Sequence, residues 1–299
     1  MIIQVQDQLQ HYSLENGEAY AVALSARDAV ETARVIHKLS PTNTAALGRL
    51  MMGALLTASD IKAEDGDVTC IIDGGGPAGK ALAVASPNGT VRATLEHPQA
   101  DLPIREKDGK LDVSGILGNT GRLTVIKDNG GKEPYIGQTQ LQTGEVAEDF
   151  AYYFTLSEQR PCLIFTGVTV ERDGSVKSAG ALAVFPLPGC REDVLQMLEE
   201  RTVGCGLLSF MLSEGMTLED AVASIFSGMH FELTEKVSVK YQCNCSKEKM
   251  ERALISIGAK DLQTLIDEDH QAEIVCQFCN KAYLFDEQAL RDLLAQATQ

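Results

Sequence analysis

The sequence predicts an α+β protein with a mixed sheet-and-helix core domain, a helical linker and a small C-terminal domain. Two tight-turn signals, at residues 87–89 and 172–174, lie between apolar stretches and indicate antiparallel hairpins. A Pro- and Gly-rich stretch at 186–189 then interrupts the pattern, and two pairs of closely spaced cysteines follow it. The predicted parts are a core domain at residues 1–185, a linker at 186–230 and a cysteine-bearing domain at 231–299.

Composition limits the classes of partner. The 299 residues carry a net charge of −16, from 26 Lys plus Arg against 42 Asp plus Glu. That charge disfavours general attraction to nucleic-acid phosphates or to an anionic membrane surface. No apolar stretch approaches the ~18 residues of a membrane span, and no secretory signal opens the chain. We therefore expect a cytoplasmic protein that binds neither nucleic acid nor membrane.

Local patterns justify the elements of the core domain. Ser40 followed by Pro41 is typical of a helix start, and apolar residues recur after it at helical spacing. Strands pair as hairpins rather than alternating with helices, which favours an α+β domain over a nucleotide-binding doubly wound sheet. The other predicted elements are a strand at 68–73, hairpin strands at 81–85 with 91–95 and at 163–170 with 176–184, and a helix at 145–156.

The predicted linker holds two short helical patterns, at residues 192–200 and 217–225. Two glycine-containing breaks separate them, one of which is 204–206. Four of the eight methionines fall in this part of the chain. Such a surface can repack around varied partners, but the pattern alone favours an ordinary small helical core.

The C-terminal domain begins with alternating polar and apolar residues at 236–241, which predict a strand. A helix with apolar residues from Met250 to Ile257 follows, and Gly258 stands where a helix end is expected. The remaining predicted elements are a short helix around 262–266, a strand at 282–285 and a last helix from Asp286.

Four cysteines of this domain have metal-ligand spacing. Cys243 and Cys245 form a CxC pair, Cys276 and Cys279 form a CxxC pair, and 30 residues lie between the pairs. Two tight thiol pairs in a reducing compartment are the ligand set of a tetrahedral zinc site, with Zn–S bonds of ~2.3 Å. Because the protein fills all four positions, we predict one structural zinc ion per chain and no catalytic residue.

Such a site has two possible roles. Its sulfurs are nucleophilic, so an oxidant can attack them, weaken coordination and release the metal. A small metal domain often loses its fold with its metal, because binding energy is folding energy. The site is therefore either a redox switch or an inert structural centre, and spacing alone does not choose between them.

The other cysteines and the histidines form no recognisable site. Cys70 and Cys162 lie in apolar, strand-like stretches and are predicted to be small core residues, whereas Cys190 and Cys205 have no assigned role. None of the histidines has the spacing of a nucleophile or metal site: they are His11, His37, His97, His230 and His270.

Three other functions compete with the zinc switch. Residues 74–80 match a phosphate-binding loop, but Ala81 replaces the magnesium-binding hydroxyl and a strand follows instead of a helix. A thiol oxidoreductase would use Cys276 and Cys279, yet such a pair normally opens a helix. A nucleic-acid-binding zinc ribbon is disfavoured because residues 231–299 hold 8 Lys plus Arg against 12 Asp plus Glu.

Several stretches together resemble a known family. They are TAALGR at 44–49, IDGGGP at 72–77, GEVAEDFAYY at 144–153, and the CxC and CxxC pairs with Tyr283 and Phe285. In this order, over nearly the whole chain, they resemble the heat-shock protein 33 family of redox-regulated bacterial chaperones.

The resemblance implies an ATP-independent holdase that is an inactive, zinc-bound monomer when reduced. Oxidation in such proteins releases zinc, unfolds the C-terminal domain and loosens the linker, which here corresponds to residues 189–229. The exposed apolar surface then binds unfolding client proteins and prevents their aggregation, often as a homodimer. The resemblance assigns the zinc ligands to the four paired cysteines and implies the oxidised disulfides Cys243–Cys245 and Cys276–Cys279.

Overall fold

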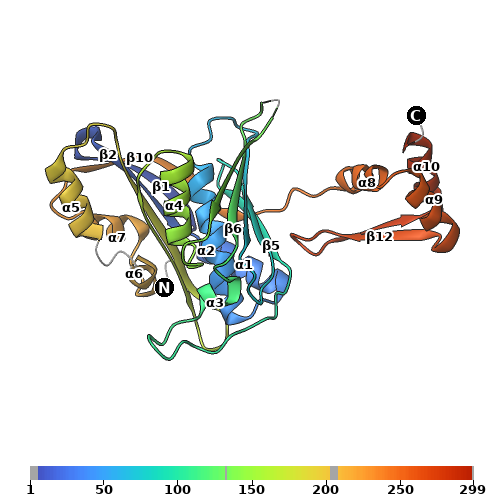
Figure 1. Cartoon of the computed structure of the whole chain (residues 1–299), viewed down its shortest axis with the longest axis horizontal. Coiled ribbons are helices and arrows are strands. Elements are labelled where there is room, and N and C mark those ends of the chain that lie inside the picture. Colours follow the sequence, from blue (N-terminus) through green and yellow to red (C-terminus); the bar gives the residue numbers. More distant parts are fainter. Residues whose placement is uncertain (1–5, 132, 203–207, 298–299) are drawn as a thin grey trace. The chain divides into compact units, whose positions relative to one another are not determined.

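The computed structural model describes residues 6–131, 133–202 and 208–297. It confirms the predicted α+β class. The chain forms two compact units, residues 1–242 and 243–299 (Figure 1). The first unit contains two β-sheets, and the second contains the four paired cysteines beside a two-stranded hairpin.

One sheet of the first unit has five antiparallel strands in the order β10-β1-β2-β9-β8. The predicted hairpin at its edge is confirmed: Glu171 N donates to Ser175 O at 2.8 Å, and Gly174 has a φ of 86°. Only glycine adopts that backbone conformation without strain, so the residue fixes the turn. The strands are β1 (Gln8–Leu14), β2 (Ala19–Ser25), β8 (Leu163–Val170), β9 (Val176–Pro186) and β10 (Phe231–Ser238).

The other sheet has six strands in the order β11-β5-β4-β3-β6-β7. All neighbours are antiparallel except the short β11, which runs parallel to β5. The predicted strand at 68–73 and the hairpin around Asn88 are confirmed as β3 and as β4 with β5. The bounds are β3 (Asp67–Asp73), β4 (Ala81–Ala85), β5 (Thr90–Leu95), β6 (Arg122–Asp128), β7 (Tyr135–Gln140) and β11 (Lys240–Tyr241).

Helix α2 (Pro41–Ala58) lies between the two sheets and is buried on nearly every side (Figure 1). The predicted start is confirmed, because the Ser40 hydroxyl accepts a hydrogen bond from Asn43 N at 3.2 Å. Gly53 lets the ring of Phe150 approach so closely that an added Cβ would lie 2.4 Å from it. The other helices of this core are η1 (Glu15–Gly17), α1 (Arg27–His37), α3 (Val113–Leu117) and α4 (Ala147–Ser157).

The linker helices pack on the five-stranded sheet. Apolar side chains on one side of that sheet, including Leu14 and Val184, form a second core with Leu198, Val222 and Phe226. The two predicted helices are present, and a third, which the sequence did not predict, lies between them. Residues 204–206 are outside the described part. The bounds are α5 (Glu192–Thr202), α6 (Leu208–Ser213) and α7 (Leu218–Ile225).

The segment before the cysteines belongs to the first unit rather than to the second. The single strand predicted at 236–241 is two strands: β10 pairs with β1, and β11 pairs with β5 in the other sheet. Between them, Val239 N donates to the Asp7 carbonyl at 2.9 Å. The three-part division of the chain stays a prediction, but these pairings move its last boundary from 231 to 243.

The second unit is small. Its two-stranded sheet and three helices enclose a core in which eight of the described residues are buried. Gly258 separates the first two helices with a φ of 95°, as expected for a residue that ends a helix. The elements are α8 (Lys247–Ser256), α9 (Ala259–Glu268), β12 (Gln271–Val275), β13 (Ala282–Asp286) and α10 (Glu287–Ala297).

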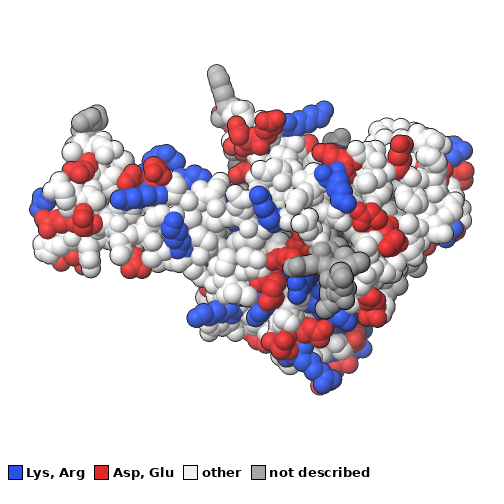
Figure 2. Space-filling model, turned by 180° about the vertical axis from the view of Figure 1, so that it is seen from behind, with Lys and Arg blue, Asp and Glu red and all other residues white. Residues whose placement is uncertain are grey.

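Charged side chains of both signs lie on the molecular surface (Figure 2). On the face shown in Figure 2, positive side chains of the described residues are interspersed with negative ones, so this face presents no continuous basic surface. Within the described ranges, every helix is too short or too polar to cross a bilayer.

Candidate metal centre

The four predicted ligands converge. The sulfur atoms of Cys243, Cys245, Cys276 and Cys279 all lie within 4.8 Å of one another. The Cys243 and Cys276 sulfurs are 3.6 Å apart, and those of Cys245 and Cys279 are 3.4 Å apart. A zinc ion with four Zn–S bonds of ~2.3 Å would hold sulfurs about 3.8 Å apart. The cluster therefore has the size and donor set of a tetrahedral zinc-thiolate site.

The CxxC pair lies in the tight turn between β12 and β13. Cys276 N donates to Lys281 O at 3.0 Å, and Asn280 N donates to Cys276 O at 2.8 Å. Asn280 adopts a φ of 57°, which asparagine tolerates better than most residues. These bonds fold the chain back so that one turn presents two sulfurs on the same side.

The CxC pair lies between β11 and α8. Cys243 and Cys245 follow β11, and α8 begins immediately after them. The Ser246 hydroxyl caps this helix by accepting a hydrogen bond from Lys249 N at 3.3 Å. In a CxC segment a single residue separates the two thiols, and residues two apart share a face where the chain is extended, so both thiols can then face one metal.

Electrostatics differ among the four thiols. Burial raises the pKa of Cys243 and of Cys279. Burial also opposes ionisation of Cys245, but hydrogen bonds from the Tyr283 hydroxyl and from the neighbouring thiols lower its pKa to about 7. The hydrogen bond to Cys245 is the main reason that the pKa of Tyr283 is raised. Cys245 is thus readily present as a thiolate, the form that binds metal.

The scattered cysteines lie elsewhere. Cys70 is buried in the core, and burial raises its pKa well above the usual range. Burial likewise raises the pKa of Cys162 to about 12. Cys70 is therefore the predicted inert core residue. Cys162 lies just before β8 and is only partly buried, packed against the edge of the core. Cys190 is partly exposed outside the cluster, and Cys205 lies outside the described residues.

His270 and the glycine-rich loop at residues 74–80 make other contacts. His270 faces Glu287 at 3.3 Å and does not join the cysteine cluster. In the loop, Gly76 N and Ala78 N donate to backbone carbonyls of α3 and its end, at 3.0 and 2.9 Å. These N–H groups are therefore not free for a phosphate, and the loop enters β4 rather than a helix.

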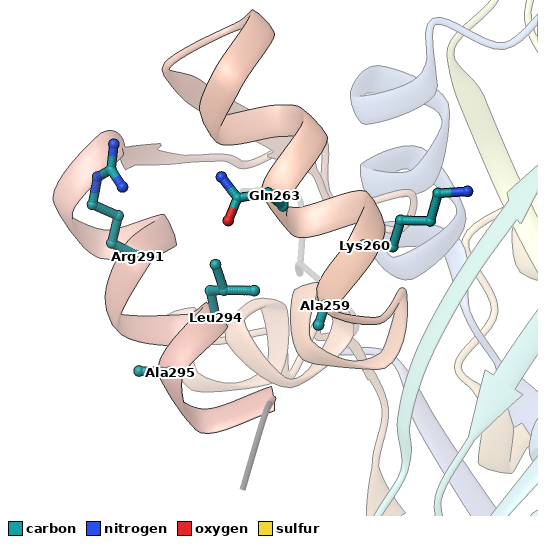
Figure 3. Close-up of a pocket in the computed structure, with 6 residues that line it drawn as sticks. All are labelled: Ala259, Lys260, Gln263, Arg291, Leu294 and Ala295. Atoms are coloured by element: carbon teal, nitrogen blue, oxygen red, sulfur yellow. The ribbon is translucent and has the colours of Figure 1, made fainter.

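A groove of about 570 Å³ lies between α9 and α10 (Figure 3). Gln263 and Leu294 point toward it, whereas Lys260 points away. Arg291 is already paired with Glu287 at 2.6 Å. Its lining includes neither a thiol nor a carboxylate, the side chains from which the metal centre of this chain and most protein metal sites are built. Its lining residues are Ala259, Lys260, Gln263, Arg291, Leu294 and Ala295.

Two further residues, Tyr283 and Lys281, contribute to the metal centre, and cysteine spacing alone does not predict them. The Tyr283 hydroxyl donates to Cys245 Sγ at 3.1 Å, and Lys281 Nζ lies 4.9 Å from the centre of the Tyr283 ring. In the sequence, Tyr283 is marked only by the family resemblance. Tyr283 and Phe285 are two residues apart in the strand that follows the CxxC turn, so their side chains point to the same face of the hairpin. This spacing is the signal in the sequence that Tyr283 faces the cysteine cluster.

Comparison with known proteins agrees with this arrangement. A family model described as "Hsp33 protein" matches residues 7–286. The 33 kDa chaperonin of Clostridium tetani is 40% identical over 288 residues, which cover 96% of this chain and 98% of the relative. A 33 kDa chaperonin of Clostridium perfringens is 41% identical over 290 residues, covering 97% and 91%.

The fold is also similar to that of a solved 33 kDa chaperonin. The crystal structure of the 33 kDa chaperonin (heat shock protein 33 homolog) from Thermotoga maritima matches with a TM-score of 0.88. It is 33% identical in sequence, and the match covers 98% of this chain and 99% of that one. Both units therefore have counterparts in a solved relative.

Proposed function

This chain belongs to the Hsp33 family of chaperones, and from that premise we propose that it is an ATP-independent holdase activated by oxidation. The observation that carries the proposal is the four-sulfur cluster inside a unit with a small core. Reduced and zinc-bound, the protein is an inactive monomer in the cytoplasm with one zinc per chain. Oxidised, it binds unfolding proteins, as a homodimer.

Zinc would be held by the four sulfurs and would supply most of the folding energy of residues 243–299. Units below about 70–80 residues rarely gain more than ~3–5 kcal/mol from their core alone. Structural zinc contributes far more, with apparent binding energies of ~10–16 kcal/mol in zinc-finger peptides. Loss of a sulfur ligand by oxidation therefore leaves the second unit without enough energy to stay folded.

The oxidation step needs only a two-electron oxidant such as hydrogen peroxide. A cysteine thiolate attacks one peroxide oxygen: a sulfur–oxygen bond forms, the oxygen–oxygen bond breaks, and hydroxide leaves. The second cysteine of the pair then attacks the sulfenic sulfur. A disulfide forms, the sulfur–oxygen bond breaks, and water leaves with the thiol proton.

Unfolding of the second unit acts on the linker through β10, the strand that leads to the cysteines. Glu219 of α7 accepts a hydrogen bond from the Gln10 amide of β1 at 2.7 Å and pairs with Lys236 of β10 at 2.6 Å. The linker helix is thus tied to the strand whose continuation enters the metal centre. When residues 243–299 unfold, β10 is less firmly held, and α7 loses its tie to that strand. The apolar face of the sheet that α7 covers then becomes available to clients.

Disulfide pairing is the first prediction. We expect peroxide to produce Cys243–Cys245 and Cys276–Cys279, although sulfurs of different pairs also lie close in the cluster, at 3.6 Å and 3.4 Å. Once the metal leaves and the unit unfolds, the nearest thiol along the chain has the highest effective concentration. Disulfides within each pair also allow residues 243–299 to stay unfolded, whereas a Cys243–Cys276 disulfide would link the two ends of the segment between the pairs.

Peptide mapping without reductant, on protein treated with peroxide at mild heat, measures this pairing. The same sample before treatment, kept reduced with zinc, is the control and should yield free thiols. Recovery of peptides joined through Cys243–Cys276 or Cys245–Cys279 as the main products would contradict the proposed switch.

The alternatives gain no support from the site. A redox-active CxxC normally opens a helix that lowers the pKa of its first thiol, but here the pair sits in a turn that enters β13. The acidic composition of the second unit likewise gives no favourable surface for nucleic acid.

A further inference from the structure

The Tyr283 hydroxyl makes a side-chain hydrogen bond to one sulfur of the metal centre. It donates to Cys245 Sγ at 3.1 Å. Tyr283 is only 7% exposed, and its ring packs in the core of the second unit. The hydroxyl is therefore held against the sulfur by packing of the ring, and water has little access to replace it.

Other donors to the cluster come from the main chain. The backbone N–H of Cys245 bonds the Cys243 sulfur, and that of Lys281 bonds the Cys279 sulfur. Such backbone donors persist whatever side chains the turn carries. Among the donors identified in the described residues, the Tyr283 hydroxyl is the one that a substitution can remove.

A hydrogen bond to a thiolate withdraws electron density from the sulfur and makes its lone pair a poorer nucleophile. Attack on peroxide begins with that lone pair, so the bond to Cys245 slows the first step of oxidation. Lys281 adds to the effect. Its ammonium group lies 4.9 Å from the ring centre, where it attracts the ring electrons and makes the hydroxyl a stronger donor.

We propose that Tyr283 is a positioning residue that sets the oxidant threshold of the switch by restraining the reactivity of Cys245. The inference rests on the proposed function, because it concerns how readily the cluster reacts with peroxide or hypochlorous acid. Tyr283 acts through the sulfur and takes no part in the bonds that change. With this restraint, the zinc-bound protein does not react at basal peroxide concentrations and reacts only at the higher concentrations of oxidative stress.

The test compares Tyr283→Phe with the unchanged protein, both reduced and loaded with zinc. Zinc released by hydrogen peroxide is followed with a coloured chelator, with no client present. We expect release to be about three- to tenfold faster in the variant, the range for losing part of a hydrogen bond to a charged group. Lys281→Met keeps the hydroxyl and should accelerate release less, in the same direction.

The control is Tyr135→Phe, which removes a tyrosine hydroxyl from the first unit, where it donates to Ser157 O at 3.3 Å. Its release rate should equal that of the unchanged protein. Release from Tyr283→Phe at the unchanged rate would overturn the proposal. So would acceleration by Tyr135→Phe of the same size.

A spectroscopic measurement separates the electronic role from a structural one. With Co²⁺ in place of zinc, Tyr283→Phe should shift the sulfur-to-cobalt charge-transfer band to longer wavelength, because the sulfur has become easier to oxidise. An unmoved band would mean that the hydroxyl does not act on the bound sulfur, and would contradict the inference. If the unchanged protein releases zinc but holds no client, the proposed function fails while the role of Tyr283 stands.

Discussion

Replacing Cys276 and Cys279 together by serine is expected to leave the second unit unfolded even when zinc is present. The substitution removes two of four thiolate ligands, and with them most of the ~10–16 kcal/mol that a structural zinc site provides. The seven buried side chains of the unit other than Cys276 cannot replace that energy. Limited proteolysis should cut residues 243–299 rapidly in the variant, and bound zinc should fall from one per chain to nearly none.

A matched control comes from the same chain. Cys190→Ser changes a partly exposed thiol outside the cluster and should alter neither zinc content nor protease resistance. In the unchanged protein, a strong chelator should reproduce the pattern of the double variant. Equal protease resistance of the second unit with and without chelator would show that its fold does not depend on metal, and the coupling of zinc to folding would be wrong.

Placing a carboxylate beneath the linker should activate the protein without oxidant. Val222 of α7 is fully buried against the five-stranded sheet. In Val222→Asp an unpaired charge would have to be buried, at a cost of about 3 kcal/mol or more, which a helix of eight residues cannot offset. We expect α7 to detach and the reduced, zinc-bound variant to suppress client aggregation.

The neighbouring position supplies the control. Ala223→Asp adds the same charge at an exposed site of the same helix and should remain inactive when reduced. Hydrogen exchange shows whether α7 has opened, and thermal unfolding shows whether the first unit is still folded. If α7 opens in Val222→Asp, zinc stays bound and clients still aggregate, the surface beneath the linker is not where clients bind.

Sequence predicted the features that local chemistry determines. The hairpins followed from their turns, α2 from Ser40 with Pro41, and the metal cluster from two tight cysteine pairs. Features that depend on long-range pairing were missed or misplaced. β10 joins β1 across more than 200 residues, which local alternation at 236–241 does not reveal.

Other misses have similar physical causes. Helix α6 has only six residues, too few for a clear period, and β11 has two. The contact of Tyr283 with Cys245 joins residues 38 apart and depends on how the hairpin folds against the CxC segment. The family resemblance pointed to Tyr283 without explaining it, and the hydrogen bond provides the explanation.

The most direct test of the central claim, that oxidation converts an inactive zinc protein into a holdase, is light scattering from a chemically unfolded client diluted into buffer. The protein is added either reduced with zinc or pretreated with peroxide at mild heat. Our account predicts that only the oxidised form suppresses aggregation. Equal suppression by the reduced form would mean a constitutive holdase with a purely structural metal, and suppression by neither form would contradict the proposed holdase function.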